Sequence, residues 1–366
     1  MNTLIKKSGS VRQSNMELLR IIAMVLIVFH HIGVHSGLGA TESISVLNRF
    51  WVLLLQSGGK IGVNVFVMIS GYFSITNTNW KIDKILKLLL QILSYSVPLY
   101  IVFASLGYIA WDIREMIKYF LPTVSISWWF VNAYFMLIIV SPVLNKMLTA
   151  LDQKNYLRIL FILLICWSVL PTVMSAYMHS NSFLWFVFLY SLSGYIRLYG
   201  REVRLSSAKL LSLAAAIVML IITAMIVIER FGIATFLLEK LGGCLVDMQY
   251  LPVLTTSLLV FMGFLKMKIN YNPVINKIAS TTFGIYLLHD DDVIRELLWM
   301  NWFSPKKFEP SPWFIPYTLG IGIVVFIGCA VIDLIRQHTL EKAYTPLIAK
   351  TVSCIKNIKN RYLFWL

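Results

Sequence analysis

The stretch RIIAMVLIVFHHIGVH, Arg20 to His35, places nine apolar residues between an arginine and a pair of histidines. A long apolar run of this kind is typical of a helix that crosses a bilayer. Ionisable side chains inside a bilayer are costly and usually face the interior of a helix bundle or a wet cavity. The stretch therefore predicts a membrane-spanning helix with one face turned toward other parts of the protein.

The composition places the rest of the chain in the same class. Of its 366 residues, 58% are hydrophobic and only 13% are charged, a balance that soluble domains of this length do not show. We therefore predict an all-α membrane protein, a polytopic bundle of about ten transmembrane helices. The spans are expected at residues 19–38, 50–76, 85–110, 128–147, 158–178, 183–199, 209–229, 248–266, 277–299 and 316–338.

Two of these spans are irregular in sequence. The second contains SGGKIG, Ser57 to Gly62, which predicts a short interfacial helix followed by a span. The ninth is the weakest, because HDDD, His289 to Asp292, falls inside it. We treat residues 1–338 as one transmembrane domain and residues 339–366 as a basic cytoplasmic tail, expected to form a helix on the membrane surface.

The basic residues indicate the orientation in the membrane. If the N-terminus lies inside, the cytoplasmic segments hold 23 of the 32 Lys and Arg residues and the outer segments hold 8, with Lys60 inside the second span. This positive-inside bias predicts that both termini are cytoplasmic. The net charge of +15 is thereby explained by topology. The lipid bilayer is the expected partner, and no nucleic-acid partner is expected.

Helical geometry puts the ionisable residues of the first span on one stripe. Arg20 and His31 differ by about 20° around the axis and lie roughly 16 Å apart along it, whereas His30 points about 80° away from Arg20. His35 lies one turn beyond His31, and Glu17 lies one turn below Arg20. A histidine that only bonds a neighbouring helix is the alternative, but an arginine in register favours a functional role for His31. We expect His30 to be a supporting or packing residue.

The same residues carry a resemblance to a known family. NMELLRIIAMVLIVFHHIG resembles the first span of the acyltransferase-3 family, integral-membrane enzymes that acylate hydroxyls of surface glycans. The mark of that span is Arg or Lys, ten residues and then His, which Arg20 and His31 match and His30 does not.

Further segments resemble the family in the expected order over nearly the whole chain. GVNVFVMISGYFSI, SWWFVNAYFMLIIVSPVLN, LYSLSGYIRLY and STTFGIYLLHD are similar to four family elements. The aligned residues are Phe66, Ser70, Gly71 and Tyr72, then Trp129, Phe130, Tyr134 and Pro142, and finally His289. One element departs: where the family usually shows an arginine pair, this chain has KIDKILKLLLQ. Its lysines keep the charge but lose the bidentate binding of phosphate.

The resemblance implies an O-acyltransferase of a bacterial plasma membrane. It would move an acyl group, expected to be acetyl, from cytoplasmic acyl-CoA to a hydroxyl of a surface or exported polysaccharide or a lipid-linked glycan. Acetyl-CoA would be a co-substrate, and no cofactor is expected to be bound. His31 would be the base, acting with Arg20, either directly on the hydroxyl or through a covalent acyl intermediate. Glu17, His30, His35 and His289 would support it or supply a second acid or base.

The two substrates are expected on opposite sides of the membrane. The anionic donor would meet Arg20 and Lys81, Lys84 and Lys87 from the cytoplasm, although topology alone also explains these lysines. The acceptor would approach Trp128, Trp129 and Tyr134 from outside, because aromatic faces suit sugar rings. An interfacial aromatic belt is the alternative explanation of the tryptophans.

A metal site and two other protein classes are alternative interpretations of these residues. His289 with its neighbouring aspartates, and the pair His31 and His35, lack a further ligand at helical spacing, so no metal site is predicted. A proton-coupled secondary transporter or flippase would also explain many spans with buried ionisable groups, but no inverted repeat is visible. The membrane half of an amino-acid racemase would need a large soluble domain, which this sequence lacks.

Overall fold

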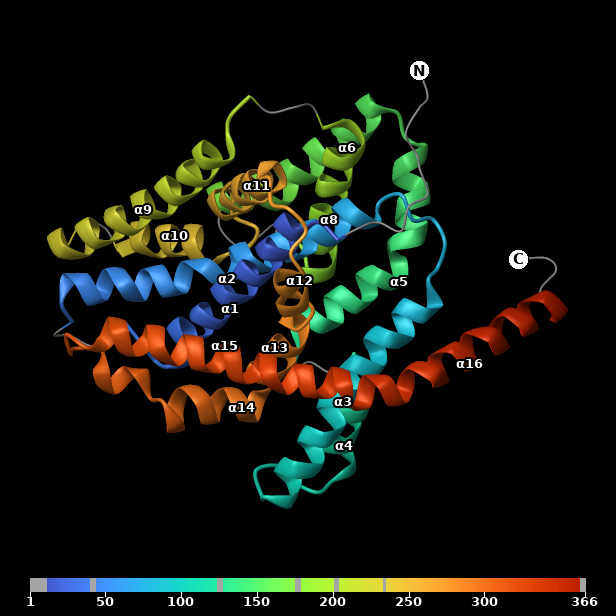
Figure 1. Cartoon of the computed structure of the whole chain (residues 1–366). Coiled ribbons are helices and arrows are strands. Elements are labelled where there is room, and N and C mark those ends of the chain that lie inside the picture. Colours follow the sequence, from blue (N-terminus) through green and yellow to red (C-terminus); the bar gives the residue numbers. More distant parts are fainter. Residues whose placement is uncertain are drawn as a thin grey trace.

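The structure, a computed structural model, describes residues 12–39, 44–123, 128–174, 179–200, 204–232 and 235–362. Its regular elements in these ranges are helices, with no strand among them. Eight helical stretches are long and apolar enough to cross a membrane. They are α1 (Ser14–His35), α2 (Val46–Ser74), α3 (Ile82–Ser105), α5 (Trp129–Ala150), α6 to α7 (Gln153–Met174), α9 (Ser207–Phe231), α10 to α11 (Phe236–Lys266) and α15 (Phe314–His338). The helices pack into one bundle (Figure 1), which confirms the predicted all-α membrane fold.

Two of the ten predicted spans are not among these eight helical stretches. The span expected at 183–199 is α8 (Ser182–Tyr199), which packs against α2, α5 and α6 in the interior of the bundle. Trp185, Phe186 and Tyr190 of α8 are fully buried, so much of this helix faces protein instead of lipid. The span expected at 277–299 is broken into α12 (Pro273–Ala279), α13 (Thr282–His289), α14 (Asp292–Glu296) and a π-helical turn, Leu297–Trp302.

The break after α13 has a local cause. The Asp291 carboxylate accepts hydrogen bonds from the backbone N–H groups of Val293 and Ile294, so a new helix begins there. Breaks of this kind at membrane depth are tolerated where the backbone is buried in protein or lines a wet cavity. His289 and Asp290 therefore stand at the end of a short helix inside the bundle.

The predicted interruption of the second span at Ser57–Gly62 is wrong, because α2 is one continuous helix. Its glycines serve close packing against α1. A Cβ at Gly59 would collide with the ring of His30, and one at Gly62 would collide with the backbone of Ala23. Small residues let membrane helices approach closely, which explains a glycine cluster without a break.

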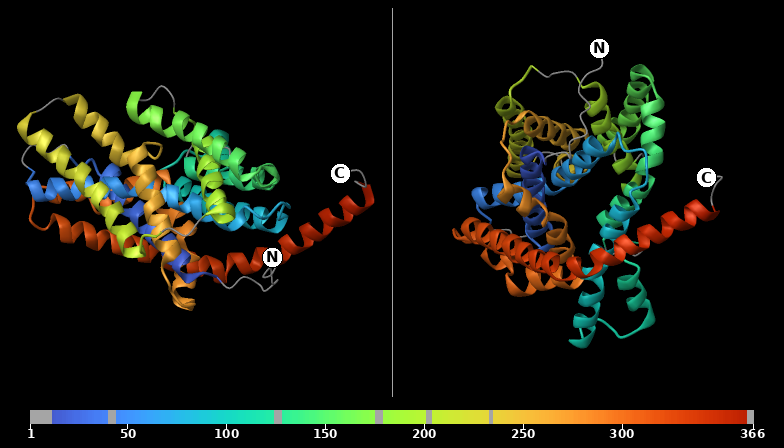
Figure 2. Two further views of the ribbon diagram at one scale, coloured as in Figure 1. Left: turned by 90° about the horizontal axis from the view of Figure 1, so that it is seen from above. Right: turned by 45° about the vertical axis from the view of Figure 1, so that its right-hand side comes forward.

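The C-terminal tail contains a long helix, α16 (Leu340–Tyr362), that leaves the bundle directly after α15 (Figures 1 and 2). Its first turns pack against α3. A short helix, α4 (Ile113–Phe120), follows α3 and packs back on it. The beginnings of α1, α3 and α12 and the end of α15 lie at one end of the bundle, where they surround a cavity.

Candidate active site

His31 lies at the centre of a group of histidine rings. The ring centroids of His30, His35 and His289 are 5.8, 5.1 and 5.0 Å from that of His31. Its Nδ1 is 2.9 Å from Nε2 of His289 and 3.5 Å from a carboxylate oxygen of Asp290. His31 and His289 are both buried. The chain thus brings a second histidine and a carboxylate from α13 and its end to the face of α1 that sequence geometry had singled out.

The hydrogen bonds of this pair assign the proton positions. Nδ1 of His289 lies 2.6 Å from the carbonyl oxygen of Ile285, one turn earlier in α13. A carbonyl only accepts, so His289 carries its proton on Nδ1 and, when neutral, offers a lone pair on Nε2. His31 must then donate its Nδ1–H to His289. The lone pair of His31 is therefore on Nε2, ready to accept a proton.

His30 makes different contacts from its neighbour. Its Nδ1–H donates to the backbone carbonyl of Gln56 over 2.7 Å, and its ring packs on Gly59. Both partners belong to α2. The structure therefore places His30 in the interface between α1 and α2.

Arg20 lies at the other end of the stripe. Its guanidinium donates to the Glu17 carboxylate over 2.7 Å and lies 5.8 Å from the centroid of the Phe66 ring. Both Arg20 and Phe66 line a cavity of about 680 Å³. The charged side chains in its wall are Arg12, Arg20, Lys87, Lys277, Arg336 and Glu341.

The cations of the cavity differ in their partners. Lys87 pairs with Glu341 at 2.5 Å, and Arg336 pairs with Asp333 at 2.7 Å. Arg12 donates only to the carbonyl oxygen of Asn276, and Lys277 donates to the amide oxygen of Gln337. Neither of these two forms an ion pair within the described part of the chain. Arg12 and Lys277 are therefore cavity cations without a carboxylate partner among the described residues.

The three lysines that were predicted to bind acyl-CoA do not all lie at this cavity. Lys87 lines it, whereas Lys81 and Lys84 are exposed and do not. The ammonium of Lys81 donates to the side chain of Asn77. The sequence did not assign Arg12 and Lys277 to a binding site, because both were interpreted only as basic residues that flank a span and set its orientation.

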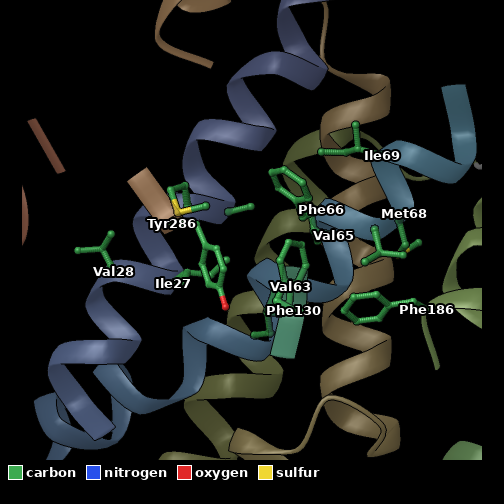
Figure 3. Packing of buried hydrophobic residues seen from close by; sticks show 14 of the residues in the cluster. Ile27, Val28, Val63, Val65, Phe66, Met68, Ile69, Phe130, Phe186 and Tyr286 are labelled. Atoms are coloured by element: carbon green, nitrogen blue, oxygen red, sulfur yellow. The ribbon is translucent and has the colours of Figure 1, made fainter. Parts of the chain in front are cut away.

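Aromatic side chains connect the cavity with the histidine pair. Tyr134 lines the cavity and stacks on Phe130, with ring centroids 5.5 Å apart. Phe130 contacts the ring of Tyr286 at 5.2 Å, and Tyr286 contacts the ring of His289 at 6.2 Å. Figure 3 shows Tyr286 and Phe130 among the buried residues of α1 and α2. Tyr134 was predicted at the acceptor site, but the structure places it in the wall of the cavity that Arg20 lines.

The two tryptophans lie at the start of α5, where Trp128 is the residue before the helix and Trp129 is its first residue. The ring of Trp129 lies below the ammonium of Lys60, 4.5 Å from Nζ to the ring centroid. Trp128 is buried, and its indole N–H has no hydrogen-bond partner within the described residues. One face of Trp129 is thus already occupied by a cation.

His31, His35 and Asp290 form a group of potential metal ligands. Their ligand atoms all lie within 4.8 Å of one another, and imidazole nitrogen and carboxylate oxygen are zinc ligands. The sequence could not show this group, because its carboxylate follows α13, far along the chain from α1. Asp290 also pairs with Arg295 at 3.3 Å. The absence of a metal stays a prediction.

A comparison with protein-family models matches residues 13–334 to a family described as an acyltransferase domain. The match begins just before α1 and ends within α15, so α16 lies outside it. No curated protein and no solved structure in the comparisons matches the chain.

Proposed function

The chain belongs to the acyltransferase-3 family, and from this premise we propose that it moves an acyl group, acetyl in the simplest case, from cytoplasmic acyl-CoA to a hydroxyl of a cell-surface glycan. The acceptor is an exported polysaccharide or a lipid-linked glycan at a bacterial plasma membrane. The observation that carries this proposal is the His31–His289 hydrogen bond, which leaves a lone pair on His31 Nε2.

The reaction follows from that lone pair. His31 Nε2 takes the proton of the acceptor hydroxyl while the oxygen attacks the thioester carbonyl carbon. When the tetrahedral intermediate collapses, the C–S bond breaks and the sulfur leaves with the proton that His31 received. His289 holds the ring in the productive tautomer, as the orienting residue of a catalytic triad does. A covalent acyl-His31 route would use the same lone pair.

We place acyl-CoA, the acyl donor, in the cavity of about 680 Å³ that Arg20 lines. Acyl-CoA carries several phosphates, and Arg12 and Lys277 are the cavity cations without a carboxylate partner in the described chain. Arg20, with its planar fork, lines the same cavity and lies beside the ring of Phe66. The apolar arm and acyl group of the donor would run along Tyr134, Phe130 and Tyr286 toward His31.

The acceptor would approach from the opposite end. His35 is only partly buried and lies one turn beyond His31. Trp128 offers a buried N–H that lacks a partner in the described chain, a donor that a sugar oxygen could accept from. Hydroxyl-rich sugars pair with such groups, which supports a glycan acceptor.

The competing function is a proton-coupled transporter or a flippase, since ionisable groups inside a membrane bundle also serve proton relays. Purified protein in proteoliposomes containing the lipid-linked glycans of its own membrane should transfer the label of [¹⁴C]acetyl-CoA, supplied outside, to a glycan. A carrier would move a solute without consuming acetyl-CoA. Label that stays entirely on acetyl-CoA, together with measurable solute flux, would favour the carrier.

The cavity charges give a separate prediction. Replacing Arg12 and Lys277 together with Gln should raise the apparent KM for acetyl-CoA about 10-fold or more and change kcat little, because phosphates are held equally in ground and transition states. The matched control replaces Lys146 and Lys154, which are exposed and away from the cavity, with Gln. Initial rates over a range of acetyl-CoA concentrations measure both constants. An unchanged KM in the Arg12 and Lys277 variant would assign both residues to topology.

A further inference from the structure

Lys60 is a charged residue in the middle of α2, a helix long and apolar enough to span the membrane. It directly follows Gly59, which packs on the ring of His30. Its ammonium makes no hydrogen bond and no ion pair with any described residue, and its one ring contact is with Trp129. Charged side chains at such positions are expensive and are retained for function.

The groups around Lys60 belong to the candidate site. The ammonium is within electrostatic range of His30, His31 and His35 on α1. It also interacts with Asp290 after α13 and Asp247 after α10, but neither carboxylate approaches to ion-pair distance. Lys60 therefore presents a positive charge beside the histidine pair, with no adjacent carboxylate to neutralise it.

We propose that the Lys60 ammonium is a catalytic residue that stabilises the oxyanion formed at the thioester carbonyl, an inference that rests on the proposed acyl transfer. When the acceptor oxygen bonds to the carbonyl carbon, the π electrons of the carbonyl move to its oxygen, which becomes negative. Lys60 donates a hydrogen bond to that oxygen. When the C=O double bond re-forms and the C–S bond breaks, the bonding electron pair leaves with the sulfur, which takes the proton from His31, and Lys60 is unchanged.

The contact with Trp129 suits this role. A cation over an aromatic face is held in place without using its N–H groups on an acceptor. The donors of Lys60 are thus positioned before the reaction and still free for the anion. Such preorganised donors act most strongly in a site shielded from water, where charges interact through a low dielectric.

The test compares Lys60→Met, which keeps most of the side-chain volume, with Lys60→Arg, which keeps the charge. Loss of one oxyanion donor typically costs about 10²–10³-fold in kcat, so we expect this loss in Lys60→Met and a partial recovery in Lys60→Arg. The KM for acetyl-CoA and the KM for the acceptor should each change by less than about threefold, because the oxyanion is absent from the bound ground state and forms only during the reaction. Lys146→Met, at an exposed position on α5, is the control.

A dithioester analogue of acetyl-CoA tests the hydrogen bond from Lys60 directly. If Lys60 only packed in the helix interface, the ratio of the rates with the thioester and the dithioester would not depend on it. Sulfur accepts hydrogen bonds poorly, so the wild-type enzyme should prefer the normal thioester far more than the uncatalysed reaction does, and Lys60→Met should lose that extra preference. If the wild-type enzyme prefers the thioester over the dithioester no more than the uncatalysed reaction does, the inference is overturned without any variant.

Two other results would also overturn it. Wild-type kcat in Lys60→Met would do so, as would a raised acceptor KM at unchanged kcat, which would assign Lys60 to binding an anionic acceptor. In both cases the wild-type enzyme still transfers acyl groups, so the proposed function stands. If the wild-type protein transfers no acyl group to glycan, the proposed function fails and this inference fails with it.

Discussion

Replacing His31 with alanine is expected to lower acyl transfer by about 10²–10⁴-fold, the usual cost of losing a general base, and by more if a covalent acyl-His31 forms. The side chain carries the one lone pair that the hydrogen-bonded pair with His289 leaves free. Its removal takes away the proposed proton acceptor without touching the cavity in which we place the donor. The measurement is label transfer from [¹⁴C]acetyl-CoA to glycan, in membranes that contain each variant at matched levels.

His30→Ala is the matched control, because it removes the same side chain one residue away. His30 donates to the Gln56 carbonyl and packs on Gly59, so its loss should lower thermal stability while most of the transfer activity remains. The two variants together distinguish a base from a packing residue. An active His31→Ala would contradict the mechanism. An inactive but folded His30→Ala beside it would place the base one residue earlier.

Local helical geometry explains why part of the site could be predicted. Positions along a single helix follow from the rise and turn per residue, so the sequence alone placed Arg20 and His31 on one stripe and His30 on another face. The resemblance named the family, which the family model confirms over residues 13–334. Positions that depend on one helix could therefore be predicted from the sequence, whereas the roles of Arg20 and His31 stay predictions.

Long-range packing explains what the sequence could not show. The resemblance suggested His289, but its hydrogen bond to His31 and the approach of Asp290 depend on the packing of α13 against α1, and no spacing rule connects positions so far apart. The continuous α2 is a similar case. The glycines of SGGKIG suggested a break, but their small size serves the close contact of α2 with α1.

The lysines around the start of α3 show that regular helical spacing alone does not predict which residues reach a cavity. Their spacing of three residues suggested one cation cluster, yet Lys81 precedes the helix and only Lys87 reaches the cavity. Arg12 and Lys277 come from segments with no helical relation to α3. Charge that surrounds a cavity is gathered from several chain segments, whereas a sequence pattern describes one segment at a time.

Replacing His289 with alanine should lower kcat by up to about 10⁴-fold, the cost of losing the orienting residue of a catalytic triad, and by no more than the loss of His31, through which His289 acts. Without His289, the neutral His31 ring is free to carry its proton on Nε2, which leaves no lone pair for the acceptor hydroxyl. Its Nδ1 would retain only the Asp290 oxygen, at 3.5 Å. The KM for acetyl-CoA should stay close to the wild-type value, because the donor cavity is untouched. His338→Ala, at the exposed end of α15, is the control and should leave kcat unchanged.

The double variant decides whether the two histidines work as one unit. Residues that act together are strongly non-additive, so His31→Ala with His289→Ala should lose little more activity than His31→Ala alone. Added imidazole should partly restore His289→Ala by filling the space beside His31 Nδ1, and the double variant should not respond in the same way. If the two losses multiply in the double variant, each histidine contributes separately. His289 would then act on the reaction by a route that does not pass through its hydrogen bond to His31, and the orienting role would be wrong.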